Sequence, residues 1–568
     1  MESKYTIAVY VGEDRTLLTK LGVVSIKTNQ QANGIPNADL ELSMLQGTWQ
    51  TFSKNPDVAL CQSGQRISVE LAEIEEKVLF AGIITEHALS LSRENSVLKL
   101  QLTHSLVGLD TVIHSQIFSD MTDQQIINNL CPSAIAKIDN KVKMKINHEQ
   151  KVQFRCTDWQ MLRRCLDANA AWLVASPTGV NIIRPRLNTA PDHLLLRDNG
   201  LQLDQASWTF SVIDQPKTLS VATWDIGEQK LMSRQANSTS IGSGAFSSKA
   251  VKLVDSTAWA VNYSTPQAAK ETALWAKNVL LNLELSRAQG EFELEGSTDY
   301  QPGQTLKVKG FGTSFDGAGL ITSVSHMLTP SHWKSRVTIG RKGMVPVLDP
   351  LPPITGMHVG TVVDNKKNDP KHYYRIRVHV SAIHEDKLKN QLWARFSMPY
   401  ASKDSGLYCY PEVGDEVVLS FFENNPCYPV IMGALHNPIN KPAIIYDNDN
   451  NQKGWVVNRD KVTAKQVFDV KANTMTFSTG QKSLVTLGED DGISIEGEAG
   501  IDMTSSAAVK ITGKKDIDIT SSAAVKIKGE EGIDITSSAA VKIKGEEGID
   551  ITSSAAVKIK GSTIDLVP

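Results

Sequence analysis

Cysteine is scarce in this sequence, with six residues among 568, and none of the six lies in a CxxC spacing or near a histidine pattern typical of zinc sites. This scarcity predicts buried, reduced thiols rather than disulfides or a metal centre. Long apolar runs are missing too, since no segment approaches the roughly 18 apolar residues of a membrane-spanning helix. The first residues, MESKYTIAVYVGEDR, hold no basic segment followed by an apolar one. We therefore expect synthesis in the cytoplasm without a signal peptide.

Neither sign of charge is in excess. The chain carries 59 Lys and Arg against 62 Asp and Glu, a formal net charge of −3. Proteins that bind nucleic acid or an anionic surface through electrostatics carry a basic excess. We therefore expect no nucleic-acid partner.

Catalytic motifs are also absent, since GxSxG, HExxH and P-loop patterns do not occur. The stretch IGSGAFSS at 241–248 lacks the Lys of a phosphate-binding loop, and DNDNNQKG at 447–454 has Gln452 where a calcium loop needs Gly. We interpret both as loops. The sequence predicts no catalytic residue, no cofactor and no metal site.

The sequence does contain a repeat. Residues 501–564 are four copies of one sixteen-residue unit without insertion or deletion, as in IDITSSAAVKIKGEEG at 517–532. Each copy divides into two octads, with apolar residues at positions 1 and 3, polar residues at 2 and 4, and small, charged or Gly residues at 5 to 8. Alternation with period two predicts a strand, whereas a helix would need apolar residues three and four apart. Short strands joined by corners at a fixed period predict a β-solenoid.

The apolar positions are expected to fill the solenoid core, and the octad plan continues upstream, less regularly, to about Val467. The predicted core residues are Ile493, Ile495, Ile501, Met503, Val509, Ile511, Ile517, Ile519, Val525, Ile527, Ile533, Ile535, Val541, Ile543, Ile549, Ile551, Val557 and Ile559.

Two solenoids fit this period. In a single-chain solenoid, sixteen residues would make one coil with two strands, and identical octads would stack on each other. In an intertwined trimer, each octad would lie on one face of a three-sided prism built from three chains. One octad buries little apolar surface alone, and partner chains would also cover its free strand edges. We favour the homotrimer, a triple-stranded β-helix.

The rest of the chain predicts a mainly β protein with helical insertions. Val-, Ile- and Leu-rich runs predict strands at 5–11, 39–44, 66–71, 78–86 and 96–102. Helices are predicted at 124–131, at 157–174 and from Thr265-Pro266 to about Leu283, the first two capped by Thr122 or Asp120 and by Thr157 or Asp158. Five later strands separated by turn residues suit a small barrel of the OB type, with a sandwich fragment as the alternative.

These patterns divide the chain into five parts. They are an α+β region with two β-rich halves at 1–345, a proline-rich linker at 346–356, an OB-type barrel at 357–444, an irregular connector at 445–466 and the octad region at 467–568.

Several stretches resemble one known family. GTVVDN, RIRVHV and LWAR, then Gly406 and PEVGDEVVLSFFENNPCYPVIMGALHN, are similar to the barrel shared by phage baseplate spikes and the VgrG proteins of type VI secretion. FAGIIT and TDWQMLRRCLDANAAWL resemble the tail-hub part of that family. The barrel motif residues are Pro411, Glu412, Val413, Gly414, Asp415, Glu416, Val417, Pro429 and Gly433.

The resemblance implies a tail hub, a barrel and a needle, in that order, and a structural function. The chain would be the homotrimeric central spike of a contractile injection particle, most like the extracellular antifeeding and virulence-cassette type. It would join the tail tube protein and baseplate proteins to a needle that breaches the target membrane mechanically. The particle would be made in the bacterial cytoplasm and released. A PAAR-like tip protein would contact Ile564, Leu566 and Val567, and a toxin could be its cargo.

Other functions stay open at this point. The same parts occur in a type VI VgrG or a phage baseplate spike, and the chain could carry a toxin or enzyme activity or act as a trimeric fibre adhesin. Only about 25 residues separate the barrel from the first octads, too few for an enzyme domain there. The tail-hub resemblance favours the spike over the fibre.

Overall fold

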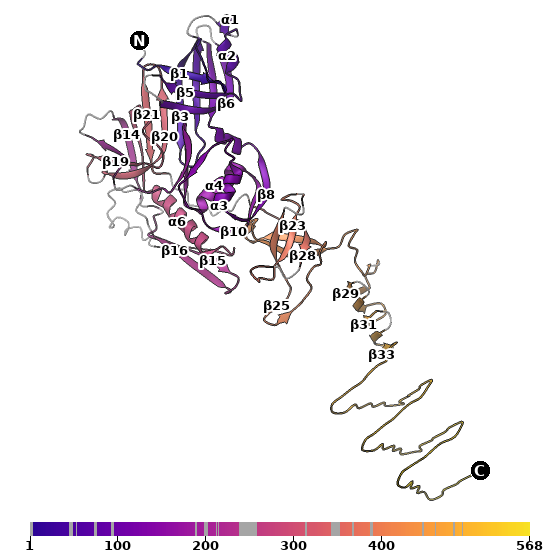
Figure 1. Cartoon of the computed structure of the whole chain (residues 1–568). Coiled ribbons are helices and arrows are strands. Elements are labelled where there is room, and N and C mark those ends of the chain that lie inside the picture. Colours follow the sequence, from indigo (N-terminus) through magenta and orange to yellow (C-terminus); the bar gives the residue numbers. More distant parts are fainter. Residues whose placement is uncertain are drawn as a thin grey trace. The chain divides into compact units, whose positions relative to one another are not determined.

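The computed structural model in Figure 1 describes residues 4–567, except 45–48, 53, 73–76, 92–95, 188–189, 198–202, 212, 214, 238–257, 313–314, 342–352, 366–368, 385, 387–389, 446–447, 460–461, 481–482 and 491. The chain forms two units, Met1–Pro442 and Ala443–Pro568. Strands far outnumber helices among the described residues, which confirms the predicted mainly β class. The glycine-rich stretch at 241–248, Asp447 and most of the predicted linker lie outside the described residues.

The largest described sheet joins strands from the beginning and the end of residues 1–345. Its order is β14-β18-β21-β20-β3-β4-β7-β6-β5-β1-β2, with β19 pairing β20 and β13 at one side. The strands are β1 (Ile7–Val11), β2 (Thr16–Leu17), β3 (Leu21–Gln31), β4 (Asn37–Met44), β5 (Arg66–Leu71), β6 (Lys77–Leu91), β7 (Ser96–Thr103), β13 (His193–Leu196), β14 (Leu203–Phe210), β18 (Ala288–Glu295), β19 (Thr305–Lys309), β20 (Gly317–Leu328) and β21 (Trp333–Ile339). Two short helices, α1 (Trp49–Phe52) and α2 (Pro56–Leu60), lie between β4 and β5.

The five strands predicted before residue 103 are confirmed, and the two predicted β-rich halves of 1–345 share one sheet. β3 pairs antiparallel with β20, so one sheet runs through both halves. The pairing sets Ile26 opposite Leu328, and both side chains are fully buried in one core cluster. Burying these two apolar side chains together favours the joint sheet over two separate ones.

A helical part follows this first group of strands. It contains the 3-10 helix η1 (Ser105–Leu109), α3 (Asp123–Leu130) and α4 (Asp158–Ala168), with strands β8 (Ile113–Thr122), β9 (Ile138–Asn140), β10 (Asn147–Thr157), β11 (Trp172–Ser176) and β12 (Gly179–Ile183). Thr122 and Thr157 are the N-caps of the two α-helices, each in a capping box, as two of the predicted caps. The second helix is shorter than predicted: it ends at Ala168, Ala170 has φ +48, and the buried run that follows is β11.

The next helix, α6 (Ala269–Leu285), packs on a small sheet with order β16-β15-β17. The strands are β15 (Thr218–Asp225), β16 (Lys230–Asn237) and β17 (Ala258–Tyr263). The predicted start at Thr265-Pro266 is wrong, because the N-cap is Ala268 and no side chain caps the helix. Thr265 is instead buried, and it lies in a turn before the helix. Its backbone carbonyl accepts the N–H of Gln267 in that turn.

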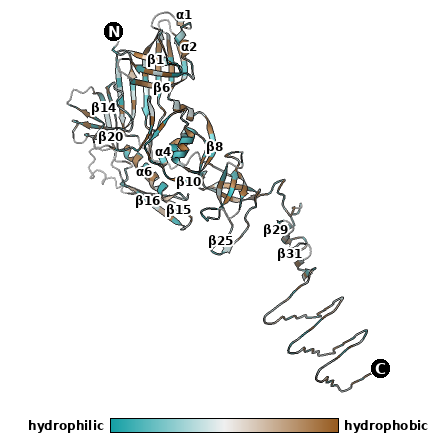
Figure 2. Ribbon diagram, viewed as in Figure 1, coloured by the Kyte–Doolittle hydropathy of each residue, from teal (hydrophilic) through white to brown (hydrophobic). Residues whose placement is uncertain are grey.

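The last part of the first unit is a closed barrel, as predicted. Its order is β22-β23-β24-β28-β27. The strands are β22 (His358–Asp364), β23 (Ile376–Val380), β24 (Gln391–Phe396), β27 (Glu416–Phe421) and β28 (Pro429–Leu435), with the hairpin β25 (Ala401–Ser402) and β26 (Ser405–Gly406) and the 3-10 helix η3 (Phe422–Asn424) in the connections. The barrel strands carry brown, hydrophobic stretches in Figure 2. Val378, Leu392 and Leu419 of these strands are fully buried. Four of the six cysteines are buried, as predicted, whereas Cys427 is partly buried and Cys409 is exposed.

The second unit begins with an antiparallel meander. Its strands pair in chain order: β29 (Gln452–Arg459), β30 (Val462–Asp469), β31 (Thr474–Thr479), β32 (Ser483–Gly488) and β33 (Gly492–Gly497). The predicted irregular connector at 445–466 is therefore corrected, since β29 and the start of β30 lie within it. The backbones of these two strands pair along their whole length, which their short apolar runs did not reveal.

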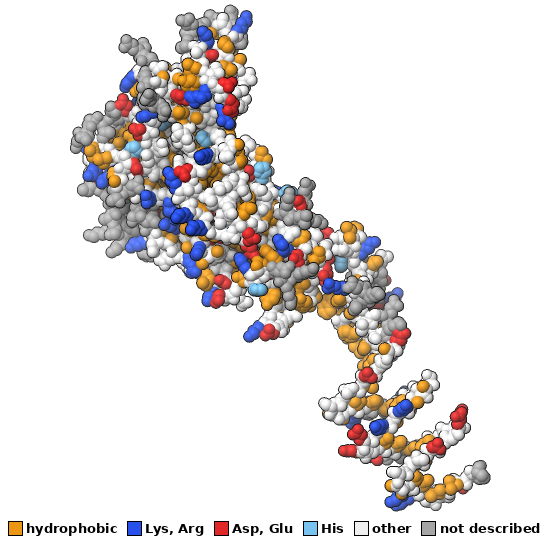
Figure 3. All heavy atoms as spheres, viewed as in Figure 1, with side chains coloured by type: hydrophobic (Ala, Val, Ile, Leu, Met, Phe, Trp, Pro, Cys, Tyr) orange, Lys and Arg blue, Asp and Glu red, His pale blue; other side chains and the backbone are white. Residues whose placement is uncertain are grey.

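Residues 501–567 continue as an open zigzag of extended segments and corners (Figure 1). No backbone hydrogen bond joins any two of these residues, all of which are described. Every one of them is exposed. Their hydrophobic side chains, orange in Figure 3, lie uncovered along the zigzag.

Candidate functional site: barrel, junction and repeats

The barrel motif residues form one turn and the two strands beside it. The backbone N–H of Glu412 donates to Asp415 Oδ2 at 2.8 Å, and that of Gly414 donates to the Val362 carbonyl at 2.9 Å. Gly414 has φ +97, a conformation that favours glycine. Pro411 to Asp415 thus form the tight turn before β27. In the turn Val413 is 55% exposed, whereas Val417 on β27 is fully buried. This geometry explains Glu412 and Asp415 as residues of the turn.

The other two motif residues lie on β28 and pair with β27. Pro429 lies opposite Phe421 and Gly433 opposite Val418, and the register shifts between Val418 and Leu419. Proline at the first position of a strand loses no ladder hydrogen bond inside it. The structure therefore brings the whole motif together at the β27–β28 pair.

The barrel core is completed by β10, a strand far from it in the sequence. Val152 and Phe154 of β10 belong to the same buried cluster as Val378 and Leu392 of the barrel, with exposed fractions of 0% and 4%. Gln150 adds polar contacts: its Nε2 donates to the Cys427 carbonyl at 2.7 Å, and its Oε1 accepts the backbone N–H of Trp393 at 2.8 Å. We call this contact between β10 and the barrel the junction. Sequence reasoning missed it, because nothing local in β10 identifies its partner.

An ion network reinforces the junction. Arg375 contacts Glu149 of β10 through two parallel N–H···O bonds and reaches Asp369 Oδ1 at 2.6 Å, while Lys371 Nζ lies 3.2 Å from Glu149 Oε2. Burial disfavours the ionised form of Asp369, but hydrogen bonds from Arg375 and from backbone N–H groups outweigh it and lower the pKa of Asp369 to about 2. Burial of Glu149 is likewise outweighed by Arg375, so the pKa of Glu149 is lowered. Both carboxylates are therefore ionised at neutral pH.

A second buried ion pair lies behind the junction. Lys151 Nζ of β10 is 2.5 Å from Asp123 Oδ1 at the start of α3, and Asn169 Nδ2 donates to Asp123 Oδ2 at 2.7 Å. Asp123 is 2% exposed. Burial opposes its ionisation, but the charge of Lys151 dominates and lowers the pKa of Asp123. His148 Nε2 also lies 3.1 Å from Asp123 Oδ1. Because all three neighbours belong to the fold, we assign the Asp123–Lys151 pair a structural role.

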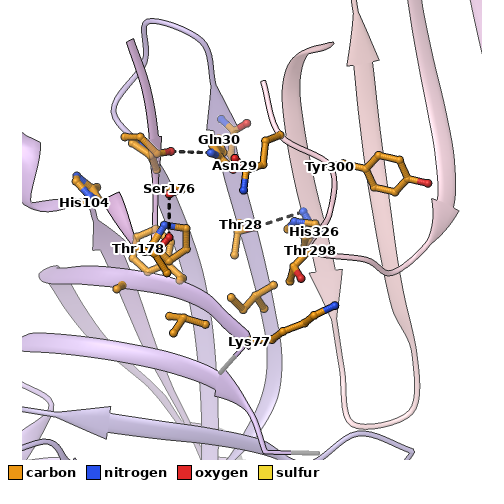
Figure 4. A pocket seen from close by; sticks show the side chains of 18 residues that line it. Thr28, Asn29, Gln30, Lys77, His104, Ser176, Thr178, Thr298, Tyr300 and His326 are labelled. Carbon is orange, nitrogen blue, oxygen red and sulfur yellow. Dashed lines mark hydrogen bonds between the residues drawn. The ribbon is translucent and has the colours of Figure 1, made fainter. Parts of the chain in front are cut away.

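One described pocket of about 160 Å³ lies beside β3 and β20. Figure 4 shows Gln30, Ser176 and His326 among its lining residues. Gln30 Nε2 donates to the Ala175 carbonyl at 2.6 Å, and His326 Nδ1 lies 2.8 Å from Ser335 Oγ. Burial lowers the pKa of His326 to about 4, so the ring is neutral at pH 7. Lys77, which also lines the pocket, lies 3.5 Å from Asp299. These polar groups are held by neighbours in the fold, and we assign the pocket no ligand.

The predicted needle-core residues are placed on exposed extended chain. Ile517 is 52% exposed, Ile519 68%, Val525 51% and Ile527 68%, and the other copies repeat these values closely. Ser521 Oγ accepts the backbone N–H of Ala523 at 3.2 Å, and the same bond recurs at Ser505, Ser537 and Ser553. The four copies therefore share one corner geometry. The inward assignment of positions 1 and 3 stays a prediction, as does the tip contact at Ile564, Leu566 and Val567, which are 53%, 88% and 81% exposed.

No group of three or more His, Cys, Asp or Glu in the described ranges could hold a metal ion. No helix in that part of the chain is long and apolar enough to cross a membrane.

Two family models match the chain. The model described as the Alg8 N-terminal domain matches residues 3–330, and the type VI secretion system/phage-baseplate injector OB domain matches residues 358–436, which include the barrel strands.

Among curated proteins, the chain is similar to two type VI secretion system spike proteins of Pseudomonas aeruginosa. VgrG1b is 33% identical over 92 residues, which are 16% of this chain and 12% of that protein. VgrG1a is 32% identical over 92 residues, 16% of this chain and 14% of that protein. The matched segment thus spans only about an eighth of the length of these relatives.

Among solved structures, the chain is similar to the Francisella PdpA–VgrG complex. The lidded form gives a TM-score of 0.54 at 9% identity, covering 87% of this chain and 80% of that one, and the lidless form gives 0.52 at 9% identity, covering 87% and 98%. At this identity the likeness shows a shared fold. Because one family model covers more than half of the chain, this protein belongs to the Alg8 N-terminal domain family, and its barrel matches the type VI secretion system/phage-baseplate injector OB domain.

Proposed function

We propose that this chain is the central spike of a contractile injection particle. Three copies would form a hub, a barrel and a membrane-piercing needle, and the hub would join the tail tube and baseplate. The observation that carries the proposal is the combination of an injector OB barrel with octad repeats whose apolar positions lie half to two-thirds exposed in a single chain. Such a face needs partner chains to cover it.

The junction supports a mechanical role. A needle that is pushed through an envelope transmits force to the part of the protein behind it, and a barrel core completed by Val152 and Phe154 of β10 couples the barrel to the hub-like region. Buried ion pairs with defined geometry resist sliding of one part on another. We propose mechanical rather than catalytic action, since the curated relatives that match 92 residues of this chain are named as spike proteins.

The partners and the location belong to the same proposal. They are the tail tube protein, baseplate proteins, a PAAR-like tip protein at the apolar end Ile564–Val567, and a toxin cargo. One structural relative is solved in complex with PdpA, which makes a bound partner reasonable for this fold. We propose a particle assembled in the bacterial cytoplasm and released, with a type VI VgrG as the second candidate because of the barrel similarity to VgrG1b.

Mass photometry and electron microscopy of the purified full-length protein test the proposal. We expect a trimer with a bulky head and one thin shaft. A folded monomer whose shaft is intact at nanomolar concentration would overturn it. Co-purification with the tube and baseplate proteins of an extracellular particle, as opposed to a type VI apparatus, separates the two candidates.

A further inference from the structure

The octad repeats carry a charge pattern that their apolar positions do not explain. Position 2 of eight successive octads alternates strictly between an acid and a base. These residues are Asp502, Lys510, Asp518, Lys526, Asp534, Lys542, Asp550 and Lys558. All eight are exposed in the structure. Exposure and solubility alone would be served by any order of the same charges.

A single copy of the chain neither pairs the strands of this region nor covers its apolar side chains. Within residues 501–567 no hydrogen bond joins two backbone groups, and position 1 and 3 side chains such as Ile533 and Ile535 are 51% and 69% exposed. A single-chain solenoid would stack one copy on the next and cover both, and the open zigzag in Figure 1 does not do so. The occupant of this surface is therefore another copy of the same chain, which offers the same backbone groups and the same apolar face.

Two registers between copies are conceivable, and they differ in their charge neighbours. In a prism with threefold symmetry, each level holds the same octad of three chains, and the next octad of each chain turns onto the neighbouring face. Along one face, octads eight residues apart, from different copies, then lie about 4.8 Å from each other. Position 2 reads Asp, Lys, Asp, Lys down that face. If identical octads stacked instead, sixteen residues apart, Asp518 would lie on Asp534 and Lys526 on Lys542.

Opposite charges facing each other on neighbouring strands stabilise a sheet, and like charges destabilise it. We propose that the alternation at position 2 fixes the register between copies at one octad, through an Asp–Lys ladder on each face of the needle with every pair shared by two chains. This inference rests on the proposed trimeric needle. The ladder adds a specificity that the apolar positions lack, because Ile and Val at positions 1 and 3 fit equally well one octad up or down.

A charge-swap cycle on the full-length protein tests the ladder. The first variant changes the four acids, Asp502, Asp518, Asp534 and Asp550, to Lys. The second changes the four bases, Lys510, Lys526, Lys542 and Lys558, to Asp. The third combines all eight changes, so it keeps the wild-type net charge and inverts every pair. Trimer content is measured by mass photometry, and needle melting by circular dichroism at 50 and 500 mM NaCl.

The ladder predicts that both four-residue variants melt more than about 5 °C below wild type at low salt, and that the eight-residue variant returns to within about 2 °C of it. Salt should lower the melting temperature of the wild type and the eight-residue variant and raise that of the other two, because screening weakens attraction and repulsion alike. If the four-residue variants do not trimerise at all, a trimeric eight-residue variant supports the ladder and a monomeric one overturns it.

Two further outcomes separate this inference from the function beneath it. Four trimers with equal melting temperatures and equal salt dependence would overturn the ladder and leave the trimeric spike intact. A monomeric wild type would overturn both.

Discussion

Arg375 and Glu149, 226 residues apart, form a bidentate ion pair. Arg375 Nη1 lies 2.9 Å from Glu149 Oε2, and Arg375 Nη2 lies 2.7 Å from Glu149 Oε1. Their side chains are 9% and 17% exposed. A planar guanidinium matched to a carboxylate fixes both distance and orientation, which a Lys cannot do. This pair therefore holds the barrel against β10 in one orientation.

Replacing Arg375 by Ala should lower the free energy of unfolding of the first unit by about 3 kcal/mol or more, because Glu149 and Asp369 would be left buried without their main partner. The measurement is urea unfolding of the full-length protein, monitored by tryptophan fluorescence. Arg336→Ala is the matched control: its side chain is 53% exposed and pairs with Glu293 on the surface, so we expect a loss below about 1 kcal/mol. Similar losses for both variants would contradict the assigned role of Arg375.

The stability of the junction should also depend on pH in the acid range. The folded pKa of Asp369, about 2, lies below the value of about 3.9 in an unfolded chain. Its contribution is thus fully present above pH 4 to 5 and is lost as the pH falls towards 2, and Glu149 changes in the same direction. Urea midpoints between pH 7 and pH 3 should fall more for wild type than for Arg375→Ala. A parallel decline would mean that other carboxylates dominate the acid response.

The Asp123–Lys151 pair allows the cost of one unpaired buried charge to be compared with the cost of removing both charges. Asp123→Leu alone should destabilise the fold by about 3 to 5 kcal/mol, because Lys151 would stay buried with its charge uncompensated. Adding Lys151→Met should recover much of this loss, since two apolar groups need no partner. Thermal melting of the single and double variants measures the recovery. A double variant less stable than the single one would show that the pair contributes more than mutual neutralisation.

Two adjacent residues of the repeat should differ strongly in how they tolerate replacement by Asp. Ile519→Asp would place three carboxylates near one level of the needle core, and each buried unpaired charge costs several kcal/mol, so trimer melting should fall sharply. Thr520→Asp puts the same group on the outward face, where we expect a change below about 1 kcal/mol. Melting of the two full-length trimers is compared by circular dichroism. Equal tolerance would contradict the inward assignment of positions 1 and 3.

Deletions should be tolerated according to register. Removing 517–532 keeps both the inward positions and the Asp–Lys order, so a shorter trimer should form. Removing 517–525, nine residues, moves every later side chain to the opposite face and should abolish trimerisation. Removing 517–524, eight residues, keeps the faces but sets Lys510 next to Lys526, and we expect a trimer of intermediate stability. Mass photometry ranks the three; a sixteen-residue deletion as damaging as the nine-residue one would refute the octad plan.

Local signals in the sequence were sufficient for many elements. Thr122 and Thr157 each stand three residues before a Gln, and both form the capping boxes that this spacing favours. The barrel strands followed from short apolar runs between turn residues. The Thr265-Pro266 signal failed because the chain makes a turn at Thr265, whose backbone carbonyl accepts the N–H of Gln267, and the helix begins only after Ala268.

Long-range pairings were beyond the sequence. Nothing near Glu149 identifies Arg375 as its partner, and the alternation in β3 does not reveal that β20 lies beside it. Both contacts depend on where the chain returns after more than 200 residues. The needle differs again: the octad pattern was plain, but in one chain its apolar positions stay exposed, and in the proposed trimer the atoms that cover them belong to other copies.

The pairing of β3 with β20 has a consequence for biosynthesis. Thr28 is made early, yet His326, whose backbone N–H donates to Thr28 Oγ1, follows 298 residues later. At about 5 to 20 residues per second, a ribosome needs on the order of 15 to 60 s to supply that strand. During this interval the edge of β3 stays open to other nascent chains on the same messenger. Chaperone demand should therefore peak before residue 328 leaves the exit tunnel, long before any octad is translated.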